Sequence, residues 1–242
     1  MQTTNNHQQL RLPGFISYGL GVVVGFFLIF IATWADIEAS AYDFPRLANA
    51  GLGGLRCPIL MTPDETSIIS LNVSNPTEDR ISPAIKVLIS TRLLPEEFLE
   101  GMQLTPGESK RLEWAVNAEN IDLGNFILAK VLLYSAYPLP SRETSCGIFV
   151  LNLPVTGRVL VPVLMVLSFL SMGWGLYTLN KFGALHGRLS KYMGSITFLA
   201  IIISLGLVLS FVGGWLSSLL VLVIALLLII ILLSSLLTDK AR

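Results

Sequence analysis

Three long stretches without a charged residue constrain this chain more than any other feature. They hold 24, 22 and 47 residues, and they lie between Arg11 and Asp36, between Arg158 and Lys181, and between Lys191 and Asp239. A helix crosses the apolar core of a bilayer with about 20 residues. The first two stretches therefore fit one span each, and the third fits two. We expect transmembrane helices at 14–34, 159–179, 193–211 and 216–237.

The composition agrees with a membrane protein. Hydrophobic residues make up 53% of the 242 residues and charged residues 13%, against about 25% charged in soluble domains. This balance excludes a disordered chain and a basic nucleic-acid binder. We therefore expect the lipid bilayer as a partner, and no nucleic acid.

Two alternatives bear on these spans. The first could be a cleaved signal peptide, since Ala39-Ser40-Ala41 has the small-x-small form, but the apolar stretch exceeds the 7–15 residues of a signal sequence. Residues 192–238 could form one helix, but at about 1.5 Å per residue it would be more than twice as long as the bilayer core is thick. An uncleaved anchor and a hairpin turning near Gly213-Gly214 are favoured.

The charge distribution predicts the topology. Residues 36–157 hold 15 of the 16 acids and nine of the 16 bases, so seven bases and one acid lie elsewhere. Basic loops stay in the cytoplasm. We expect an extracytoplasmic domain at 36–157, and cytoplasmic segments at 1–13, 180–192 and 238–242, in a cell membrane such as the bacterial cytoplasmic membrane. Three side chains are expected as anchors at the membrane interface: Trp34, Arg158 and Trp215.

Residues 55–153 read as short strands separated by turns. Alternating apolar residues mark strands at 66–74, 81–90 and 110–116. A central strand is expected at 125–135, which is apolar on both faces, a last strand at 144–151, and a short helical link at 93–100. Trp114, between Leu112 and Val116, is expected in the core. Six or so strands in about 100 residues predict an antiparallel, all-β immunoglobulin-like sandwich.

The order of these segments carries a family resemblance. Asn72–Asn75 ends a strand, Ile85–Ile89 forms the next, Leu104–Glu108 follows as L-x-P-G-E, and Gly124–Val131 opens another. Residues 66–135 therefore resemble bacterial extracytoplasmic immunoglobulin-like domains of the cell-adhesion-related, CARDB type. The resemblance implies a binding or spacer domain without catalytic residues. The chain has one copy rather than a repeat array.

Both cysteines, Cys57 and Cys146, lie in the block expected outside. Two cysteines in an oxidising compartment usually pair, so we expect a structural disulfide. Two free buried thiols are the alternative. A redox pair is a further one, although the C-x-x-C spacing that tunes reactivity is missing.

The residues predict no catalytic, cofactor-binding or metal site. The two histidines, His7 and His186, are far apart, and the acidic pairs Asp64-Glu65, Glu78-Asp79 and Glu96-Glu97 lack the spacing of a calcium loop. Neighbouring acids at turns are read as a solvated rim.

The predicted spans carry no ionisable residue except tyrosine, but they carry small residues at a four-residue spacing. Such residues let helix backbones approach closely. The candidates for helix packing are Gly21, Gly25, Ser171, Gly175, Gly206, Ser210 and Gly214.

These features favour a non-enzymatic membrane scaffold or accessory subunit whose outer domain contacts other membrane or extracytoplasmic proteins. A channel or transporter component is an alternative, and only Ser and Thr side chains such as Ser168 could line its path. A membrane-bound enzyme is a second alternative, for which Arg158 is the only charged residue near a span on the outer side.

Overall fold

The structure is a computed structural model of the chain, and it describes residues 3–42, 48, 50–134, 137, 139–183, 190–212 and 215–241. These residues form two compact units, which are described separately. The helical unit contains residues 3–30, 161–183, 190–210 and 215–241. The β unit contains residues 31–160, with the gaps given above, and residues 211–212.

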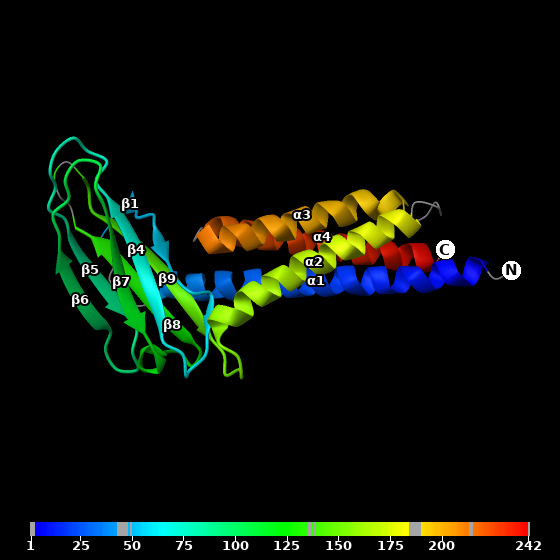
Figure 1. The fold of residues 1–242 in the computed structure, drawn as a ribbon, viewed down its shortest axis with the longest axis horizontal. Coiled ribbons are helices and arrows are strands. Elements are labelled where there is room, and N and C mark those ends of the chain that lie inside the picture. Colours follow the sequence, from blue (N-terminus) through cyan, green and yellow to red (C-terminus); the bar gives the residue numbers. More distant parts are fainter. Residues whose placement is uncertain are drawn as a thin grey trace. The chain divides into compact units, whose positions relative to one another are not determined.

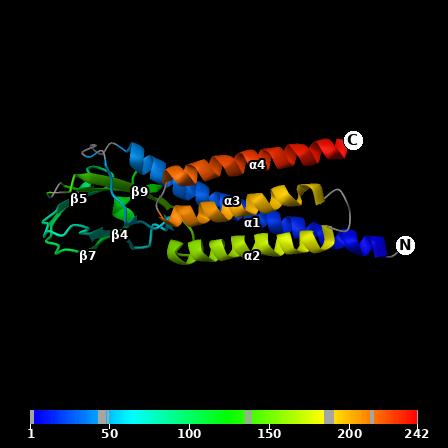
Figure 2. The same cartoon turned by 90° about the horizontal axis from the view of Figure 1, so that it is seen from above.

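The described part of the chain has four long apolar helices, as predicted. Their bounds are α1 (Thr3–Ala41), α2 (Gly157–Gly183), α3 (Ser190–Val212) and α4 (Trp215–Ala241). Each holds a stretch that is long and apolar enough to cross a membrane: Pro13–Ala41, Gly157–Lys181, Tyr192–Phe211 and Trp215–Ser235. Within the helical unit the four helices run alongside one another in both views (Figure 1 and Figure 2).

The helices extend beyond the predicted spans. Helix α1 begins at Thr3, inside the expected tail 1–13, and ends at Ala41 instead of 34; α2 and α3 reach into the expected loop 180–192; and α4 covers most of 238–242. A helix satisfies its own backbone hydrogen bonds, so it can continue past the end of an apolar stretch, and α1 does so even through Pro13. The Gly213-Gly214 turn, His186 and Arg188 lie outside the described residues.

Two sheets form the β unit. The larger has the strand order β1-β9-β8-β5-β6, with β3 also paired to β9, and the smaller has the order β2-β4-β7. The smaller sheet is built from β2 (Leu55–Arg56), β4 (Ser67–Ser74) and β7 (Ser109–Val116). The larger is built from β1 (Ala50–Gly51), β3 (Leu60–Met61), β5 (Ala84–Ile89), β6 (Glu96–Gly101), β8 (Phe126–Leu133) and β9 (Arg142–Val150). A short 3₁₀ helix, η1 (Ala118–Asn120), follows β7.

One apolar core joins the two sheets, as in a sandwich. The smaller sheet contributes Ile69, Leu71 and Val73 from β4, and β5, β8 and β9 of the larger sheet contribute residues such as Ile85 and Ile127. Trp114 belongs to this core with 4% of its surface exposed, which confirms its predicted place. Its indole N–H donates a hydrogen bond of 2.9 Å to Glu100 Oε1, so the buried ring keeps a polar partner.

Two predictions for this unit are wrong. The sandwich is not purely antiparallel, because β1 and β3 each pair in parallel with β9. These two-residue strands cover an edge of β9 that would otherwise expose its backbone groups. The helical link expected at 93–100 is also incorrect, since β6 pairs with β5. Every residue of β6 is exposed or only half-buried, so this edge strand lacks the alternation that marks a half-buried strand.

Candidate functional site

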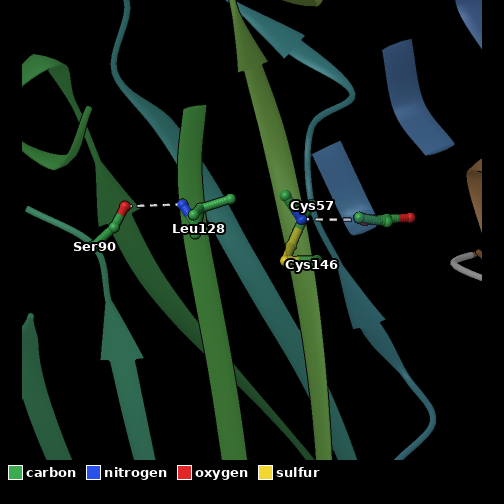
Figure 3. Close-up of a disulfide and its surroundings, with 6 residues drawn as sticks. Cys57, Ser90, Leu128 and Cys146 are labelled. Atoms are coloured by element: carbon green, nitrogen blue, oxygen red, sulfur yellow. Dashed lines mark hydrogen bonds between the residues drawn. A yellow bond between two sulfur atoms is a disulfide. The ribbon is translucent and has the colours of Figure 1, made fainter. Parts of the chain in front are cut away.

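The two cysteines form a disulfide in the β unit. Cys57 is bonded to Cys146 of β9 across 89 positions of sequence, with a Cα–Cα distance of 6.4 Å (Figure 3). Cys146 belongs to the sandwich core and Cys57 packs against it. The bridge therefore links the segment between β2 and β3 to a strand inside the larger sheet.

The last turns of α1 pack on the larger sheet. Ala35 and Ala39 are buried against Leu88, Phe126 and Leu128, so residues 36–41 are helical rather than the first part of an independent domain. Small alanine side chains let the helix backbone approach the strands closely.

Gly147 of β9 lies at the closest point of this contact. Its amide donates a hydrogen bond of 3.1 Å to Asp36 Oδ1. A Cβ atom on Gly147 would overlap the backbone carbonyl of Ala35, so only glycine fits here. Just beyond the helix, the Tyr42 hydroxyl donates a hydrogen bond to Asp122 Oδ2, which fixes the exit from α1 to the loop before β8.

Glu65 holds the first residues of α2. Its carboxylate accepts hydrogen bonds from the backbone amides of Gly157 at 2.8 Å, Arg158 at 3.4 Å and Thr62 at 3.4 Å. The amides of a first helical turn have no partner within the helix and carry the positive end of its dipole. The Glu65 carboxylate accepts hydrogen bonds from these amides, and its negative charge interacts favourably with the positive end of the helix dipole.

This role corrects the interpretation of Asp64-Glu65 as a solvated rim. Asp64 is exposed, but only 9% of the surface of Glu65 is exposed. The partners of Glu65 in α2 lie 92 and 93 positions away, and no local spacing in the sequence reveals them.

The small residues of the first two spans face other helices of the helical unit. A Cβ atom on Gly21 would lie 2.7 Å from the Met172 backbone nitrogen, and one on Gly175 would lie 2.6 Å from the Tyr18 backbone nitrogen. A Cβ atom on Gly25 would lie 2.6 Å from Ile203 Cγ2 of α3. The backbone carbonyl of Ser171 accepts a hydrogen bond of 3.1 Å from the Ser17 hydroxyl.

The predicted row on the third span is placed only in part. A Cβ atom on Gly206 would lie 2.6 Å from Ile29 Cδ1 of α1 and 2.9 Å from Val221 Cγ1 of α4. The Ser210 hydroxyl donates to the carbonyl of Gly206 within α3, at 2.9 Å. Gly214 lies outside the described residues.

Polar side chains bind across helices in a way that sequence reasoning missed. Ser168, considered there as a lining for an ion path, is fully buried, and its hydroxyl donates to the carbonyl of Gly21 at 2.7 Å. Tyr18 is 7% exposed, and its hydroxyl donates to the carbonyl of Ile196 at 2.7 Å. Both groups join helices to one another.

The expected interface anchors lie near the ends of helices. Trp34 is exposed on α1, Arg158 is the second residue of α2, and Trp215 is the first residue of α4. Arg158 also contributes its backbone amide to the Glu65 contact.

No group of three or more His, Cys, Asp or Glu side chains within the described ranges could hold a metal ion. Two titratable groups of the β unit have a pKa shifted by local partners. Hydrogen bonds from the backbone amide and the hydroxyl of Thr105, at 2.8 and 2.7 Å, lower the pKa of Glu108. A hydrogen bond to Glu97, 2.7 Å away, raises the pKa of Lys86.

Comparisons with known proteins give structural matches alone. No family model and no curated protein matches the chain. A CARDB domain from Pyrococcus furiosus, solved in complex with di-metal ions, matches 45% of this chain and 99% of its own length, at 12% identity and a TM-score of 0.34.

Two β-glucosidases also match, in each case over only a small part of the β-glucosidase chain. The enzyme from Listeria innocua covers 40% of this chain and 15% of its own, at 14% identity and a TM-score of 0.27. The enzyme from Erythrobacter marinus covers 42% and 15%, at 14% identity and a TM-score of 0.28. The CARDB domain is of the kind that residues 66–135 resemble.

Proposed function

We propose that this chain is an integral membrane scaffold or accessory subunit, whose four helices cross the bilayer and whose β unit binds other proteins outside the cytoplasm. The observation that carries the proposal is the double attachment of the β unit. Its sheet packs on the last turns of α1 through Ala35 and Ala39, and Glu65 binds the first turn of α2. These contacts lie within the β unit and order the segments at which the chain enters and leaves it.

The side of the membrane is proposed from charge. Seven basic residues and one acid lie outside residues 36–157, and basic segments stay in the cytoplasm. Both termini and the segment around position 186 are then cytoplasmic.

Labelling tests this topology. Single cysteines introduced as Leu93→Cys and His186→Cys would be treated in intact cells with a maleimide that cannot cross membranes. Leu93 has 93% of its surface exposed in the β unit, so its cysteine should react from outside, whereas position 186 should react only after the cells are opened. Reaction of position 186 in intact cells would overturn the proposed orientation.

Purification tests the scaffold role. The chain would be isolated in mild detergent, and the proteins that accompany it would be identified by mass spectrometry. Stable membrane or extracytoplasmic subunits are expected at a fixed ratio. A chain that purifies alone and conducts ions in liposomes would contradict the proposal and favour a channel component.

A further inference from the structure

A pocket of about 580 Å³ opens in the β unit beside strands β2, β4 and β7 of the smaller sheet. We call it the arginine pocket, because its lining includes Arg56, Arg111 and Arg142. The other described residues that line it are small, polar or aliphatic. Neither the disulfide nor the contacts that α1 and α2 make with the sheets involve this pocket.

The strand register brings two of the arginines to one face. Arg56 of β2 pairs with Ser70 of β4, and Asn72 of β4 pairs with Arg111 of β7. Successive side chains of a strand point to opposite faces of the sheet. Since Ile69, Leu71 and Val73 fill the core, Ser70 and Asn72 point to the opposite face, where Asn72 is exposed and Ser70 is 7% exposed.

The outer face of this sheet thus carries the guanidinium groups of Arg56 and Arg111 with a hydroxyl and an amide between them, and Glu113 lies on the same face opposite Ser70. Arg142, the first residue of β9, adds a third guanidinium from the other sheet. Strands β4 and β7 lie side by side at this face (Figure 1).

The charge of the pocket opposes that of its surroundings. Residues 36–157 hold 15 acids against nine bases, yet the described lining contains three arginines and no acid. Arg111 pairs with Glu113 at 2.7 Å, and both side chains are exposed, so solvent screens the pair. Arg56 and Arg142 form no ion pair with any described residue. Their guanidinium groups are therefore not engaged by a described carboxylate and are available to a bound anion.

Gly54 lets the chain before β2 approach β4 closely at one wall of the pocket. It has a φ of +91°, and a Cβ atom there would lie 2.8 Å from the carbonyl oxygen of Asn72. The backbone N–H of Asn72 donates a hydrogen bond to the backbone carbonyl of Gly54 at 3.3 Å. The segment 52–54 therefore lies close against β4, and the neighbouring Gly53 presents no side chain to the cavity.

We propose that the arginine pocket binds an oxyanion of the phosphate class, carried on a small organic group. Guanidinium groups bind phosphate oxygens with two parallel N–H donors, and the side chains of Ser70 and Asn72 provide further donors. Leu52, Leu133 and Leu139 supply an apolar wall for the organic part. The same chemistry is offered by a soluble phosphate compound and by a phosphate headgroup on a lipid surface.

The first arm of the test uses a soluble anion. The full chain in zwitterionic nanodiscs would be titrated with sodium pyrophosphate by calorimetry, with sodium chloride of equal ionic strength as the reference. One saturable site is expected. Arg56→Gln and Arg142→Gln should each weaken binding by about tenfold or more, as expected for a lost hydrogen bond between charged groups. Arg92→Gln is the matched control, because Arg92 is an exposed arginine of the β unit outside this pocket.

The second arm uses a lipid source. The nanodiscs would be sedimented with vesicles that contain phosphatidic acid, or with vesicles of phosphatidylcholine alone. Pyrophosphate binding identifies a soluble ligand, and binding to the acidic vesicles alone identifies a headgroup. Either result supports the site if the Arg56 and Arg142 variants weaken the binding by about tenfold or more. Arg142→Lys keeps the positive charge but loses the two parallel N–H donors, so its loss of binding should be smaller than that of Arg142→Gln. It tests the site if Arg142→Gln does not fold. No binding in either arm, or an equal loss with Arg92→Gln, would overturn the proposal.

Discussion

The carboxylate of Glu65 lies 2.8 Å from the backbone nitrogen of Gly157, although 92 positions separate the two residues. Glu65 stands in the turn between β3 and β4, and Gly157 begins α2. This contact ties the beginning of the β unit to the point where the chain leaves it. It is also one of two such attachments, since Asp36 binds Gly147 at the end of α1.

Glu65→Ala should destabilise the β unit by about 1–3 kcal/mol, because it leaves buried amides without an acceptor. Denaturant unfolding of the full chain in detergent, followed by tryptophan fluorescence, measures the loss. Asp64→Ala is the matched control, since Asp64 is the exposed neighbour. Equal effects of the two substitutions would show that the Glu65 contact contributes nothing specific.

Gly147→Ala should separate the end of α1 from the sheet. Its new methyl group would overlap the Ala35 carbonyl, and overpacking of this kind costs about 1–3 kcal/mol. Hydrogen exchange of the segment 142–150 should become faster. Gly101→Ala serves as the control, because a Cβ atom on Gly101 would meet nothing within 4 Å. Unchanged exchange in the Gly147 variant would contradict the described contact.

The sequence predicts those parts of the fold that a local pattern of residues determines without distant partners. Long apolar stretches give the four helices, alternation gives the strands β4 and β7 with Trp114 in the core, and a run that is apolar on both faces gives β8. In the turn L-x-P-G-E, Gly107 has a φ of +72°, as a type II turn requires at this position. Each of these features follows from local chemistry and burial.

The features that the sequence hides depend on distant partners. Strand β6 is an edge strand without alternation, and Glu65, Asp36 and Ser168 look like a solvated acid, a span boundary and a possible pore residue. Their partners are backbone groups of Gly157, Gly147 and Gly21. The backbone carbonyl is common to every residue type, and the backbone amide to every type but proline. The sequence therefore does not show which backbone group a side chain binds, and only the three-dimensional arrangement identifies that partner.

Removal of the disulfide should lower the stability of the β unit. A bridge across 89 positions stabilises by about 4–5 kcal/mol in the chain-entropy model, less any strain. Cys146→Ala should therefore melt at a lower temperature than the oxidised chain, and close to the reduced wild type. Alkylation of both cysteines after unfolding without reductant, detected by mass spectrometry, would show that the bridge does not form.

The turn at Glu108 predicts a dependence on pH. Its pKa lies below the ordinary 4.5 because Thr105 donates two hydrogen bonds to the ionised form. A lowered folded pKa gives stability that is present above about pH 4.5 and is lost as the pH falls through the folded pKa. The difference in melting temperature between wild type and Glu108→Gln should therefore shrink in that acidic range. Thr105→Val, which keeps the backbone donor, should give a smaller effect, and a Glu108 pKa at or above 4.5 in a carbon NMR titration would refute the prediction.

Gly21→Ala should weaken the contact between α1 and α2. The added Cβ atom would lie 2.7 Å from the backbone nitrogen of Met172 and from the backbone carbonyl oxygen of Ser168. Backbone atoms inside a helix cannot yield as the tip of a side chain can, so the helices must separate, at a cost of about 1–3 kcal/mol. Gly173→Ala is the matched control on α2, since its Cβ atom would meet nothing within 4 Å. The Gly21 variant should lose its monodisperse elution in mild detergent at a lower temperature than the Gly173 variant, while its disulfide stays intact; identical behaviour of the two would mean that close packing at Gly21 does not hold the helical unit together.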